Sequence, residues 1–489
     1  MHNLEYILKK ASALIDKKNY NGAKSVLLEL IKEVKNIKID ARTYYLLYLA
    51  FDGLKEVKGA KKYLEKCLKI NNTNHIALNN LANLYLKEGN TIKAEKFYLE
   101  SLENKNDYLI AIINIAIFYQ STGELDEAKK FYLKAIKLAP KGLSIYFNLS
   151  RIDKNFMSEE KVKYIEDLIK NKKIKPIDIA YGFFLLAAHE RKKNFFIKEI
   201  DYLEKAHQHV FNEKLSKNNQ TLNYWQNIIP KKYDKFSFIN ENTKNELINF
   251  SPIFIIGLPR SGSTMVEAIL SSGGTTVENL GETSIINGAV VITHNELQKK
   301  ENTIIDLNLI NNTVLKSMRD RNFLNSKTKI FTDKSLENFF YVEIILKVFP
   351  KAKFINTFRN IEDNIFAIFQ QSLSKLSWTH SIENILEYID NYFKIIEYFM
   401  KKYPEKILSL DLKELTNNPE ETSKKLYSFS NLKWNVNVLD FYRRKDLLIS
   451  TASNIQIRSN IQKYDHEKYR PYKEFLKKFS HKYPWINKD

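Results

Sequence analysis

Residues 252–272, in the second half of the chain, read PIFIIGLPRSGSTMVEAILSS. The apolar run Ile253–Ile256 predicts a short buried strand. A loop with two glycines follows, and Met265–Leu270 then predicts an apolar helix. A strand, a glycine-containing loop and a helix N-terminus form a cradle for an anion, because the loop N–H groups and the helix dipole both favour negative charge. The segment therefore predicts an α/β fold with a phosphate-type loop.

Three more apolar runs, each bounded by turn or charged residues, predict further strands. They are Lys329–Thr332, Lys353–Phe358 and Ile407–Leu410. Because longer helical stretches separate the strands, we expect a parallel sheet with helices on both faces. Ligands bind such sheets beyond the carboxyl ends of the strands. The residues that directly follow each strand are therefore the candidates for a site.

The loop after the first strand differs from the Walker pattern at one position. Ser263 stands where a Walker loop has the lysine that binds the β- and γ-phosphates. The positive charge lies earlier in the loop, at Arg260, whose planar guanidinium suits oxyanions. The sequence thus predicts an anion other than an ordinary nucleoside triphosphate and no essential metal, and it argues against an ATP- or GTP-dependent kinase.

The first half of the chain has a 34-residue repeat. The residues shared by two successive copies are Leu81, Ala82, Tyr85, Gly89, Ala94, Tyr98 and Ser101, then Ile115, Ala116, Tyr119, Gly123, Ala128, Tyr132 and Ala135. Small residues where helices cross and aromatic residues at fixed offsets are typical of stacked helix pairs. Gly89 and Gly123 fall at the turn between the two helices of a pair. The repeat resembles the tetratricopeptide repeat family.

This resemblance implies three parts. Residues 1–154 form a tetratricopeptide-repeat array that binds an acceptor or a protein partner. A half copy follows at Tyr146 and Leu149, and residues 155–245 form a degenerate helical repeat or connector. Residues 246–489 form the P-loop-like α/β domain with the parallel sheet.

Composition narrows the class of protein further. The 489 residues include 77 Lys and Arg against 57 Asp and Glu, which gives a net charge of +20. That excess favours an anionic partner, but the lysines are scattered through helical stretches, so a solvated surface explains most of it and no nucleic-acid motif accompanies it. The single cysteine, Cys67, excludes a disulfide framework and a cysteine-based zinc cluster. No apolar run approaches the ~20 residues of a membrane-spanning helix, and we expect a soluble, cytoplasmic protein.

Four elements of the second half resemble one family when taken in order. The loop PRSGST at 259–264 is similar to the 5′-phosphosulfate loop, usually PRSGTT, of sulfotransferases that use 3′-phosphoadenosine 5′-phosphosulfate (PAPS). Lys334 follows the second strand in FTDKS, and Arg359 follows the third in FPKAKFINTFRN. Residues 450–458, STASNIQIR, resemble a segment of sulfotransferases fused to tetratricopeptide repeats. The resemblance spans about residues 250–475.

The resemblance implies that PAPS is the co-substrate and assigns residues to it. The residues implied for the 5′-phosphosulfate are Arg260, Ser261, Gly262, Ser263 and Thr264. Arg359 matches the arginine that binds the 3′-phosphate, and Arg458 lies where it could contact the nucleotide. Two positions depart from the family pattern, since Ala367 replaces a serine and Leu412 replaces a tyrosine that contacts adenine.

Three residues match the catalytic positions of tyrosylprotein sulfotransferases. Glu282 corresponds to the glutamate that takes the proton of the acceptor, while Lys334 and Ser453 correspond to donors at the sulfuryl group and the bridging oxygen. Simpler explanations exist for each, since Lys334 could be a surface lysine and Ser453 a helix N-cap. His294 and His380, which match no motif, are expected at the surface.

We therefore predict a sulfotransferase that moves a sulfuryl group from PAPS to a hydroxyl or amine, with the repeat array recognising the acceptor or a partner. The alternative is a non-catalytic interaction protein whose nucleotide domain senses a ligand or has decayed, which Ala367 and Leu412 favour.

Overall fold

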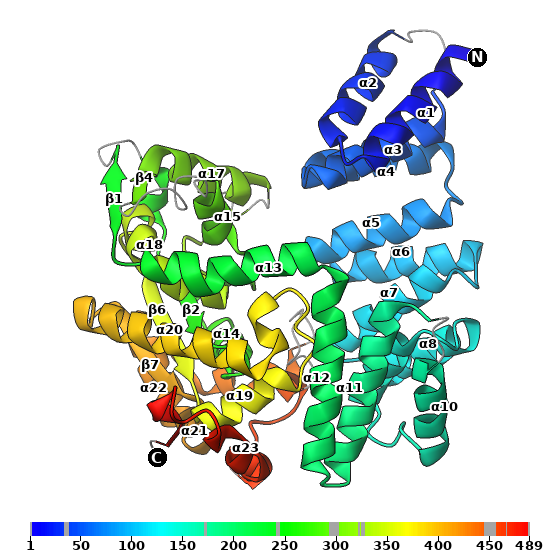
Figure 1. Ribbon diagram of the computed structural model, residues 1–489. Coiled ribbons are helices and arrows are strands. Elements are labelled where there is room, and N and C mark those ends of the chain that lie inside the picture. Colours follow the sequence, from blue (N-terminus) through cyan, green and yellow to red (C-terminus); the bar gives the residue numbers. More distant parts are fainter. Residues whose placement is uncertain are drawn as a thin grey trace. The chain divides into compact units, whose positions relative to one another are not determined.

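The computed structural model describes residues 2–33, 39–170, 174–240, 245–292, 303–320, 323, 328–444, 456–465 and 467–487 (Figure 1). By their internal contacts the residues form two compact units, Met1–Pro140 with Met318–Asn325 and Lys141–Ser317 with Ser326–Asp489. The division 1–154, 155–245 and 246–489 remains a prediction, since the helices after Pro140 share a unit with the sheet.

The first unit is a series of antiparallel helix pairs. Its helices are α1 (His2–Asp16), α2 (Tyr20–Glu33), α3 (Ala41–Gly53), α4 (Val57–Ile70), α5 (His75–Lys87), α6 (Thr91–Asn104), α7 (Leu109–Thr122) and α8 (Leu125–Leu138). Helices α3, α5 and α7 begin at residues 41, 75 and 109, which are 34 residues apart, so the predicted period is confirmed.

Glycine and alanine make the close approach within each pair possible. Gly89 and Gly123 have φ values of +77° and +92°, the left-handed conformation that the turn between paired helices requires. Ala60, Ala94 and Ala128 occupy equivalent positions of successive second helices and are fully buried. The small side chains predicted at the helix crossings therefore lie in the core of the array.

The second unit starts with further helices that prolong the period. They are α9 (Leu143–Ile152), α10 (Glu159–Lys170), α11 (Pro176–Lys192), α12 (Phe196–Glu213) and α13 (Leu215–Asn223). Helices α9 and α10 begin 34 residues after α7 and α8, so the half copy predicted at Tyr146 and Leu149 is a complete helix pair.

A five-stranded parallel sheet in the order β3-β5-β2-β6-β7 forms the centre of the second unit. Its strands are β2 (Ile253–Gly257), β3 (Glu278–Asn279), β5 (Phe331–Asp333), β6 (Lys353–Phe358) and β7 (Ile407–Asp411). The four predicted strands are confirmed, and the two-residue strand β3 at the edge adds a fifth. A separate parallel pair, β1 (Phe236–Ile239) and β4 (Thr303–Asp306), was not predicted.

Helices cover both faces of this sheet. The helices of this part of the chain are α14 (Ser263–Leu270), α15 (Ile285–Val291), α17 (Leu307–Asp320), α18 (Val342–Val348), α19 (Ile361–Phe369), α20 (Ile382–Lys402), α21 (Leu412–Asn417), α22 (Pro419–Phe429) and α23 (Lys473–Lys477). Side chains of β6 alternate between the faces. Ile355 joins a buried cluster with Val266 of α14, whereas Asn356 accepts a hydrogen bond from Tyr392 of α20 at 2.7 Å.

Buried polar side chains join the helices α11 and α12 to the sheet part of the unit. Glu199 of α12 is fully buried and accepts hydrogen bonds from Arg191, Gln370 and Tyr472 at 2.7, 3.0 and 2.5 Å. Paired in this way, a buried carboxylate avoids most of the cost of leaving water. This network connects α11, α12, the end of α19 and the C-terminal segment.

A histidine pair lies at a second junction between the helices and the sheet part. The Nδ1 atoms of His207 and His380 are 3.0 Å apart, and Nε2 of His207 contacts the Phe369 carbonyl at 2.7 Å. His380 is buried, so its expected surface position is wrong. It ends the 3₁₀ turn η6 (Ser377–His380), which contacts α12. Burial lowers the pKa of His207 to about 3 and that of His380 to about 4, which keeps both neutral. His294 lies outside the described residues.

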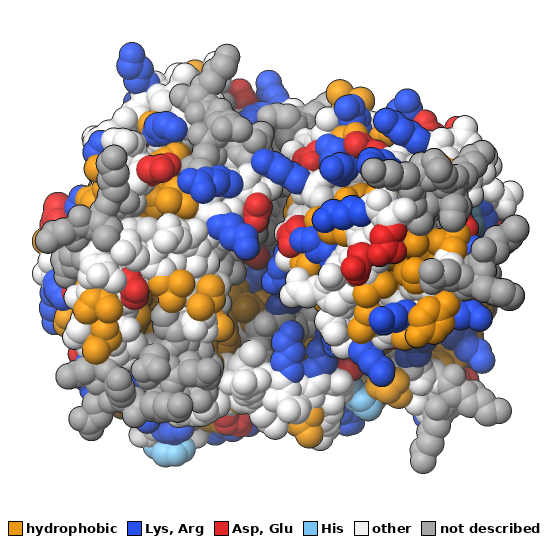
Figure 2. Space-filling model, turned by 90° about the horizontal axis from the view of Figure 1, so that it is seen from above, with side chains coloured by type: hydrophobic (Ala, Val, Ile, Leu, Met, Phe, Trp, Pro, Cys, Tyr) orange, Lys and Arg blue, Asp and Glu red, His pale blue; other side chains and the backbone are white. Residues whose placement is uncertain are grey.

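Lysine and arginine side chains are spread over the surface. Figure 2 shows them on one face, interspersed with acidic, apolar and uncharged side chains. Several pair with carboxylates one helical turn away, as in Lys394–Asp390 and Lys401–Glu397. Such exposed pairs contribute little to stability. Among the described residues, no helix is long and apolar enough to cross a membrane.

Candidate functional site

The loop between β2 and α14 has three residues in the left-handed conformation. Gly257, Arg260 and Gly262 have φ values of +131°, +70° and +89°. A Cβ atom on Gly257 would collide with the carbonyl of Thr357, and one on Gly262 would lie 2.6 Å from Cδ1 of Leu412. Gly257 is therefore required by space as well as by φ, whereas Gly262 is required chiefly by φ, since the side chain of Leu412 can move. Arg260 is held in a conformation that costs a non-glycine residue about 1 kcal/mol or more, which is typical of functional loops.

The loop is braced by Ser261. Its hydroxyl donates to the Leu258 carbonyl at 2.7 Å and lies 2.8 Å from Oγ1 of Thr357 on β6. Because these contacts use the hydroxyl, Ser261 can offer a ligand chiefly its backbone N–H. Ser263 and Thr264, both buried, start helix α14, where N–H groups at the helix N-terminus favour an anion.

Arg359 lies beside this loop at the end of β6. Its Nη1 donates to the Arg260 carbonyl at 3.3 Å, and its Nε donates to the hydroxyl of Tyr464 at 2.9 Å. The guanidinium lies over the rings of Tyr464 and Tyr469, at 4.8 and 5.2 Å from the ring centroids. Asp363 is 3.8 Å from Nη2 and accepts a short hydrogen bond from Tyr464. Arg359 is thus held next to Arg260, with its guanidinium enclosed by the rings of Tyr464 and Tyr469.

Positive charges concentrate around the loop. The pKa of Arg260 is lowered to about 10, chiefly by burial and also by the guanidinium groups of Arg151 and Arg359, although Tyr469 acts in the opposite sense. Arg260 is still charged at neutral pH. Three guanidinium groups in mutual repulsion gain most from an anion with several negative charges. Sequence reasoning missed Arg151, because it stands at the end of α9 with no motif around it.

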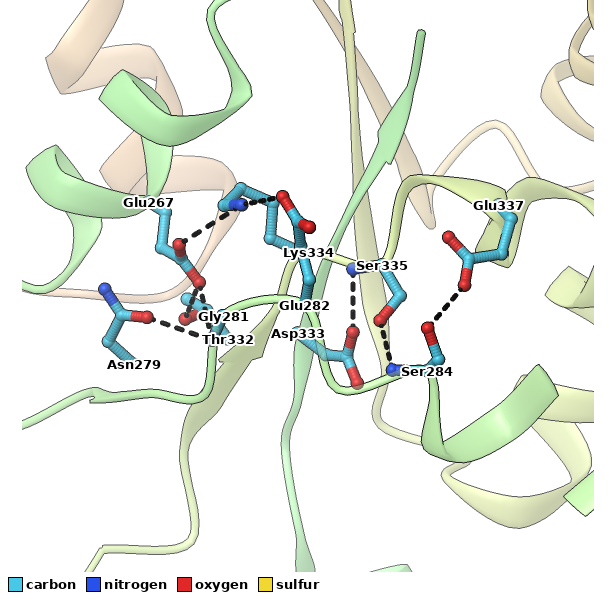
Figure 3. A network of polar contacts seen from close by, with 10 residues as sticks. All are labelled: Glu267, Asn279, Gly281, Glu282, Ser284, Thr332, Asp333, Lys334, Ser335 and Glu337. Carbon is cyan, nitrogen blue, oxygen red and sulfur yellow. Dashed lines mark hydrogen bonds and ion pairs between the residues drawn. The ribbon is translucent and has the colours of Figure 1, made fainter. Parts of the chain in front are cut away.

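Glu282, which follows β3, and Lys334, which follows β5, contact each other. In the sheet, β5 and β6 lie on opposite sides of β2, so this pair and Arg359 lie on opposite sides of the loop. Nζ of Lys334 donates to Oε1 of Glu282 at 2.9 Å, and the side chain of Lys334 is 2% exposed against 57% for Glu282 (Figure 3). A second carboxylate, Glu267 of α14, lies 3.9 Å from Nζ. Sequence reasoning brought Glu282 and Lys334 forward but missed Glu267, which sits within the apolar pattern of the loop helix.

Asp333, next to Lys334, has a structural role. It accepts hydrogen bonds from the Ser335 N–H at 2.8 Å and from the hydroxyl of Thr283. Burial raises the pKa of Asp333, whereas these hydrogen bonds lower it. Asp333 therefore ties the segment after Glu282 to the segment after Lys334, and so fixes their spacing.

The two departures from the family pattern take defined positions. Ala367 is buried in α19, and the nearby Asn364 donates its amide to the Pro259 carbonyl of the loop at 2.9 Å. Leu412, at the start of α21, packs against Gly262. Leu412 thus lies against the loop, Ala367 lies one helical turn after a residue that bonds to the loop, and neither contributes a hydroxyl.

The closing segment is described in part. Arg458 donates from Nη1 to the Arg444 carbonyl at 2.7 Å, so it holds the chain next to the loop helix, where Arg444 in turn donates to the Ser271 carbonyl. Ser453 lies outside the described residues. The predicted roles of both residues, and of the other site residues, remain predictions. No group of three or more His, Cys, Asp or Glu side chains suited to a metal occurs in the described part of the chain.

Comparison with known proteins identifies the two parts by family. Residues 252–436 match the model of the sulfotransferase family, and residues 41–74, 63–96 and 110–141 match models of the tetratricopeptide repeat. The chain therefore combines tetratricopeptide repeats with a domain of the sulfotransferase family, which confirms the resemblance seen in the sequence.

A relative and several solved structures show the extent of the similarity. An uncharacterized protein of Aquifex aeolicus (strain VF5) is 29% identical over 342 residues, which are 65% of this chain and 43% of the relative, so the chain spans less than half the relative's length. MamA aligns with 42% of this chain and 96% of its own at 16% identity (TM-score 0.26). The sulfotransferases STF1 of Mycobacterium tuberculosis H37Rv and STF9 of Mycobacterium avium align at 11% identity, with 58% and 66% of this chain, 92% and 97% of theirs, and TM-scores of 0.28 and 0.25.

Proposed function

We propose that the second unit transfers a sulfuryl group from PAPS to a hydroxyl or amine of an acceptor, and that the repeat array recognises the acceptor or a protein partner. The observation that carries the proposal is the pairing of Arg359 with the Arg260 loop at one strand end and of Lys334 with Glu282 at a neighbouring strand end. The first pair suits a nucleotide with two separate anionic groups. The second pair suits proton removal next to developing negative charge.

The site fits the donor at its phosphate ends. The backbone of Arg260–Thr264 would hold the 5′-phosphosulfate, and the left-handed glycines let the backbone approach it closely. Arg359 would bind the 3′-phosphate, with its guanidinium already oriented by Tyr464 and the Arg260 carbonyl. No metal ion is part of the proposal, because Arg260, Arg359 and Lys334 are assigned the neutralisation of charge.

The transfer forms a bond from the acceptor oxygen or nitrogen to sulfur while the bond from sulfur to the bridging phosphate oxygen breaks. Glu282 takes the proton of the acceptor, and the electron pair of the broken bond stays on the departing adenosine 3′,5′-bisphosphate. Lys334 lies 2.9 Å from the base and would stabilise that charge. A loose transition state of this kind depends mainly on positioning and electrostatics.

A thermal-shift titration tests the proposal. Adenosine 3′,5′-bisphosphate is compared with adenosine 5′-phosphate and ATP on the wild-type protein. A ligand at 100 times its Kd adds about 2.7 kcal/mol to the free energy of unfolding. We expect stabilisation by the 3′-phosphorylated nucleotide alone, followed by formation of adenosine 3′,5′-bisphosphate from PAPS when a matching hydroxyl or amine acceptor is added.

The second candidate function is a repeat-mediated interaction protein whose nucleotide domain does not catalyse transfer. Ala367 and Leu412 favour it, because neither carries the hydroxyl that the family pattern has at its position, and Leu412 lies against Gly262 of the loop. If the three nucleotides stabilise the protein equally, or none does, the transferase proposal is wrong and this candidate replaces it.

A further inference from the structure

Glu267 is a buried carboxylate of α14 that contacts two other segments around Lys334. Its Oε1 accepts hydrogen bonds from the hydroxyl of Thr332 at 3.1 Å and from the N–H of Gly281 at 3.2 Å (Figure 3). Its Oε2 lies 3.9 Å from Nζ of Lys334, and its side chain is only 4% exposed. One carboxylate thus links the loop helix α14, strand β5 and the residue that precedes Glu282.

The carboxylates of Glu267 and Glu282, which both face Lys334, differ in burial and in how firmly hydrogen bonds hold them. Glu267 is held by two hydrogen bonds within the core, whereas Glu282 is largely exposed and contacts Lys334 at one oxygen. A buried ammonium is costly to maintain without a counter-charge. Glu282, as the proposed base, becomes neutral each time it takes a proton, and at that moment it no longer balances Lys334.

We infer that Glu267 is a positioning residue that keeps Lys334 charged and in place throughout turnover, while Glu282 changes its charge. The catalytic part of this inference rests on the proposed function, but the Glu267–Lys334 ion pair does not. Glu267 also orients the chain before Glu282, because it accepts the N–H of Gly281, whose φ is +63°. It acts on the reaction through Lys334 and Glu282, without contacting the reacting atoms itself.

The electrostatics around the pair support this role. Burial alone would lower the pKa of Lys334, but the carboxylates of Glu267 and Glu282, with a smaller contribution from Asp333, outweigh it and raise that pKa above its ordinary value. Burial, with a contribution from Asp333, raises the pKa of Glu267 above its ordinary value, and Lys334, the hydroxyl of Thr332 and the N–H of Gly281 offset part of that increase. Each member of the pair therefore favours the charged form of the other.

The first test needs no substrate. Thermal unfolding of wild type, E267Q, K334M and the double variant is followed from about pH 6 to about pH 11. The glutamine keeps an acceptor oxygen for Thr332 and Gly281 but removes the charge. We expect E267Q to lower Tm, and K334M to restore part of the loss in the double variant by removing the unbalanced ammonium.

The pH dependence has a defined sign. A lysine whose folded pKa is raised contributes stability below its unfolded pKa of about 10.4, and that stability is lost as the pH rises through the folded pKa. The deficit of E267Q should therefore be largest near neutral pH and shrink at high pH. E337Q is the matched control, since Glu337 lies in the neighbouring cluster, bonded to Ser284 and not to Lys334. A deficit that is independent of pH, or additive with K334M, would overturn the ion-pair role.

The second test uses turnover of PAPS with an accepted hydroxyl or amine. In E267Q we expect kcat to fall about tenfold with KM for PAPS within about twofold, and the loss of activity at high pH to begin about one pH unit earlier. E267D, which restores the charge, should recover part of kcat. An unchanged pH profile would overturn the catalytic part. If wild type neither binds adenosine 3′,5′-bisphosphate nor consumes PAPS, the proposed function fails, and the unfolding data still decide the ion pair.

Discussion

The two ends of the candidate site hold their positive charges in different ways. Lys334 is enclosed by carboxylates, at 2.9 and 3.9 Å. Arg359 is enclosed by two tyrosine rings and a backbone carbonyl, and among the described residues its carboxylate contact is Asp363 at 3.8 Å. A charge balanced within the protein is suited to meet charge that develops during a reaction. A charge that is surrounded by aromatic rings is less neutralised by the protein, so it attracts an already charged ligand more strongly than a lysine paired with carboxylates does.

Removal of the balanced charge should have the largest effect. K334M deletes the ammonium proposed to face the departing oxygen, and we expect kcat for PAPS-dependent transfer to fall by about a thousandfold, as when a transition-state donor is lost. Binding of adenosine 3′,5′-bisphosphate should change by less than about threefold. K394M, which removes an exposed lysine paired with Asp390, is the control. A K334M protein with near-normal kcat would show that the two ends do not differ in this way.

Removal of the ligand-facing charge should act on binding. R359A is expected to weaken adenosine 3′,5′-bisphosphate by about a hundredfold while adenosine 5′-phosphate changes little, because charge-assisted hydrogen bonds to one phosphate are lost. Isothermal titration calorimetry with both nucleotides measures the split. R443A, at an exposed arginine paired with Asp440, is the control. Equal weakening of both nucleotides would mean that Arg359 does not read the 3′-phosphate.

A smaller change tests the tyrosine hydroxyl that orients Arg359 while leaving the charge of Arg359 in place. Y464F removes the hydroxyl that accepts from Arg359 and donates to Asp363, but keeps the ring. We expect adenosine 3′,5′-bisphosphate to bind about fivefold more weakly, as for loss of one hydrogen bond that orients a charged group. Y442F is a matched control, because Tyr442 also accepts from an arginine Nε, that of Arg443, on the exposed surface. Unchanged affinity in Y464F would assign the orientation of Arg359 to the stacked rings alone.

The smallest expected effect concerns a residue that departs from the family pattern. A367S places a hydroxyl in α19, one helical turn after Asn364, whose amide bonds to the loop. If the hydroxyl reaches the 3′-phosphate, adenosine 3′,5′-bisphosphate should bind up to about threefold more tightly, since one net hydrogen bond contributes about 0.5–1.5 kcal/mol less the cost of burial. The Tm without nucleotide serves as the internal control. Unchanged binding with unchanged Tm would show that the position faces away from the ligand.

The backbone of the site was predictable because local patterns determine it. The strands β2, β6 and β7 are short apolar runs, and the loop after β2 is recognisable in the sequence by its glycines and Arg260. The repeat was predictable for a similar reason, since small and aromatic residues recur at a spacing of 34 positions. Strand β3 was missed because a two-residue strand has no periodicity to detect.

The second layer of the site was not predictable because it depends on contacts across the chain. Glu267 meets Gly281 and Thr332, which are 14 and 65 residues away. In the sequence it is one polar residue in a helix, where a solvent-facing position is the ordinary expectation. His380 was misplaced for the same reason, since its partner His207 lies 173 residues earlier in the chain. Burial of such groups becomes visible only when the packing is known.

The network around Glu199 has a consequence for dissecting or recombining this protein. Its members come from α11, α12, the end of α19 and the C-terminal segment. A fragment that starts near residue 246 would lose Glu199, which accepts from both Gln370 and Tyr472. Gln370 would still donate to the Tyr472 hydroxyl at 2.9 Å, but the O–H of Tyr472 would lose its acceptor. A graft of foreign repeats is therefore best joined at Pro140, where the contacts divide the chain, so that the last helix pairs travel with the sheet. Residues 155–245, which the sequence predicts to be a connector, thus include helices that pack against the sheet part of the second unit.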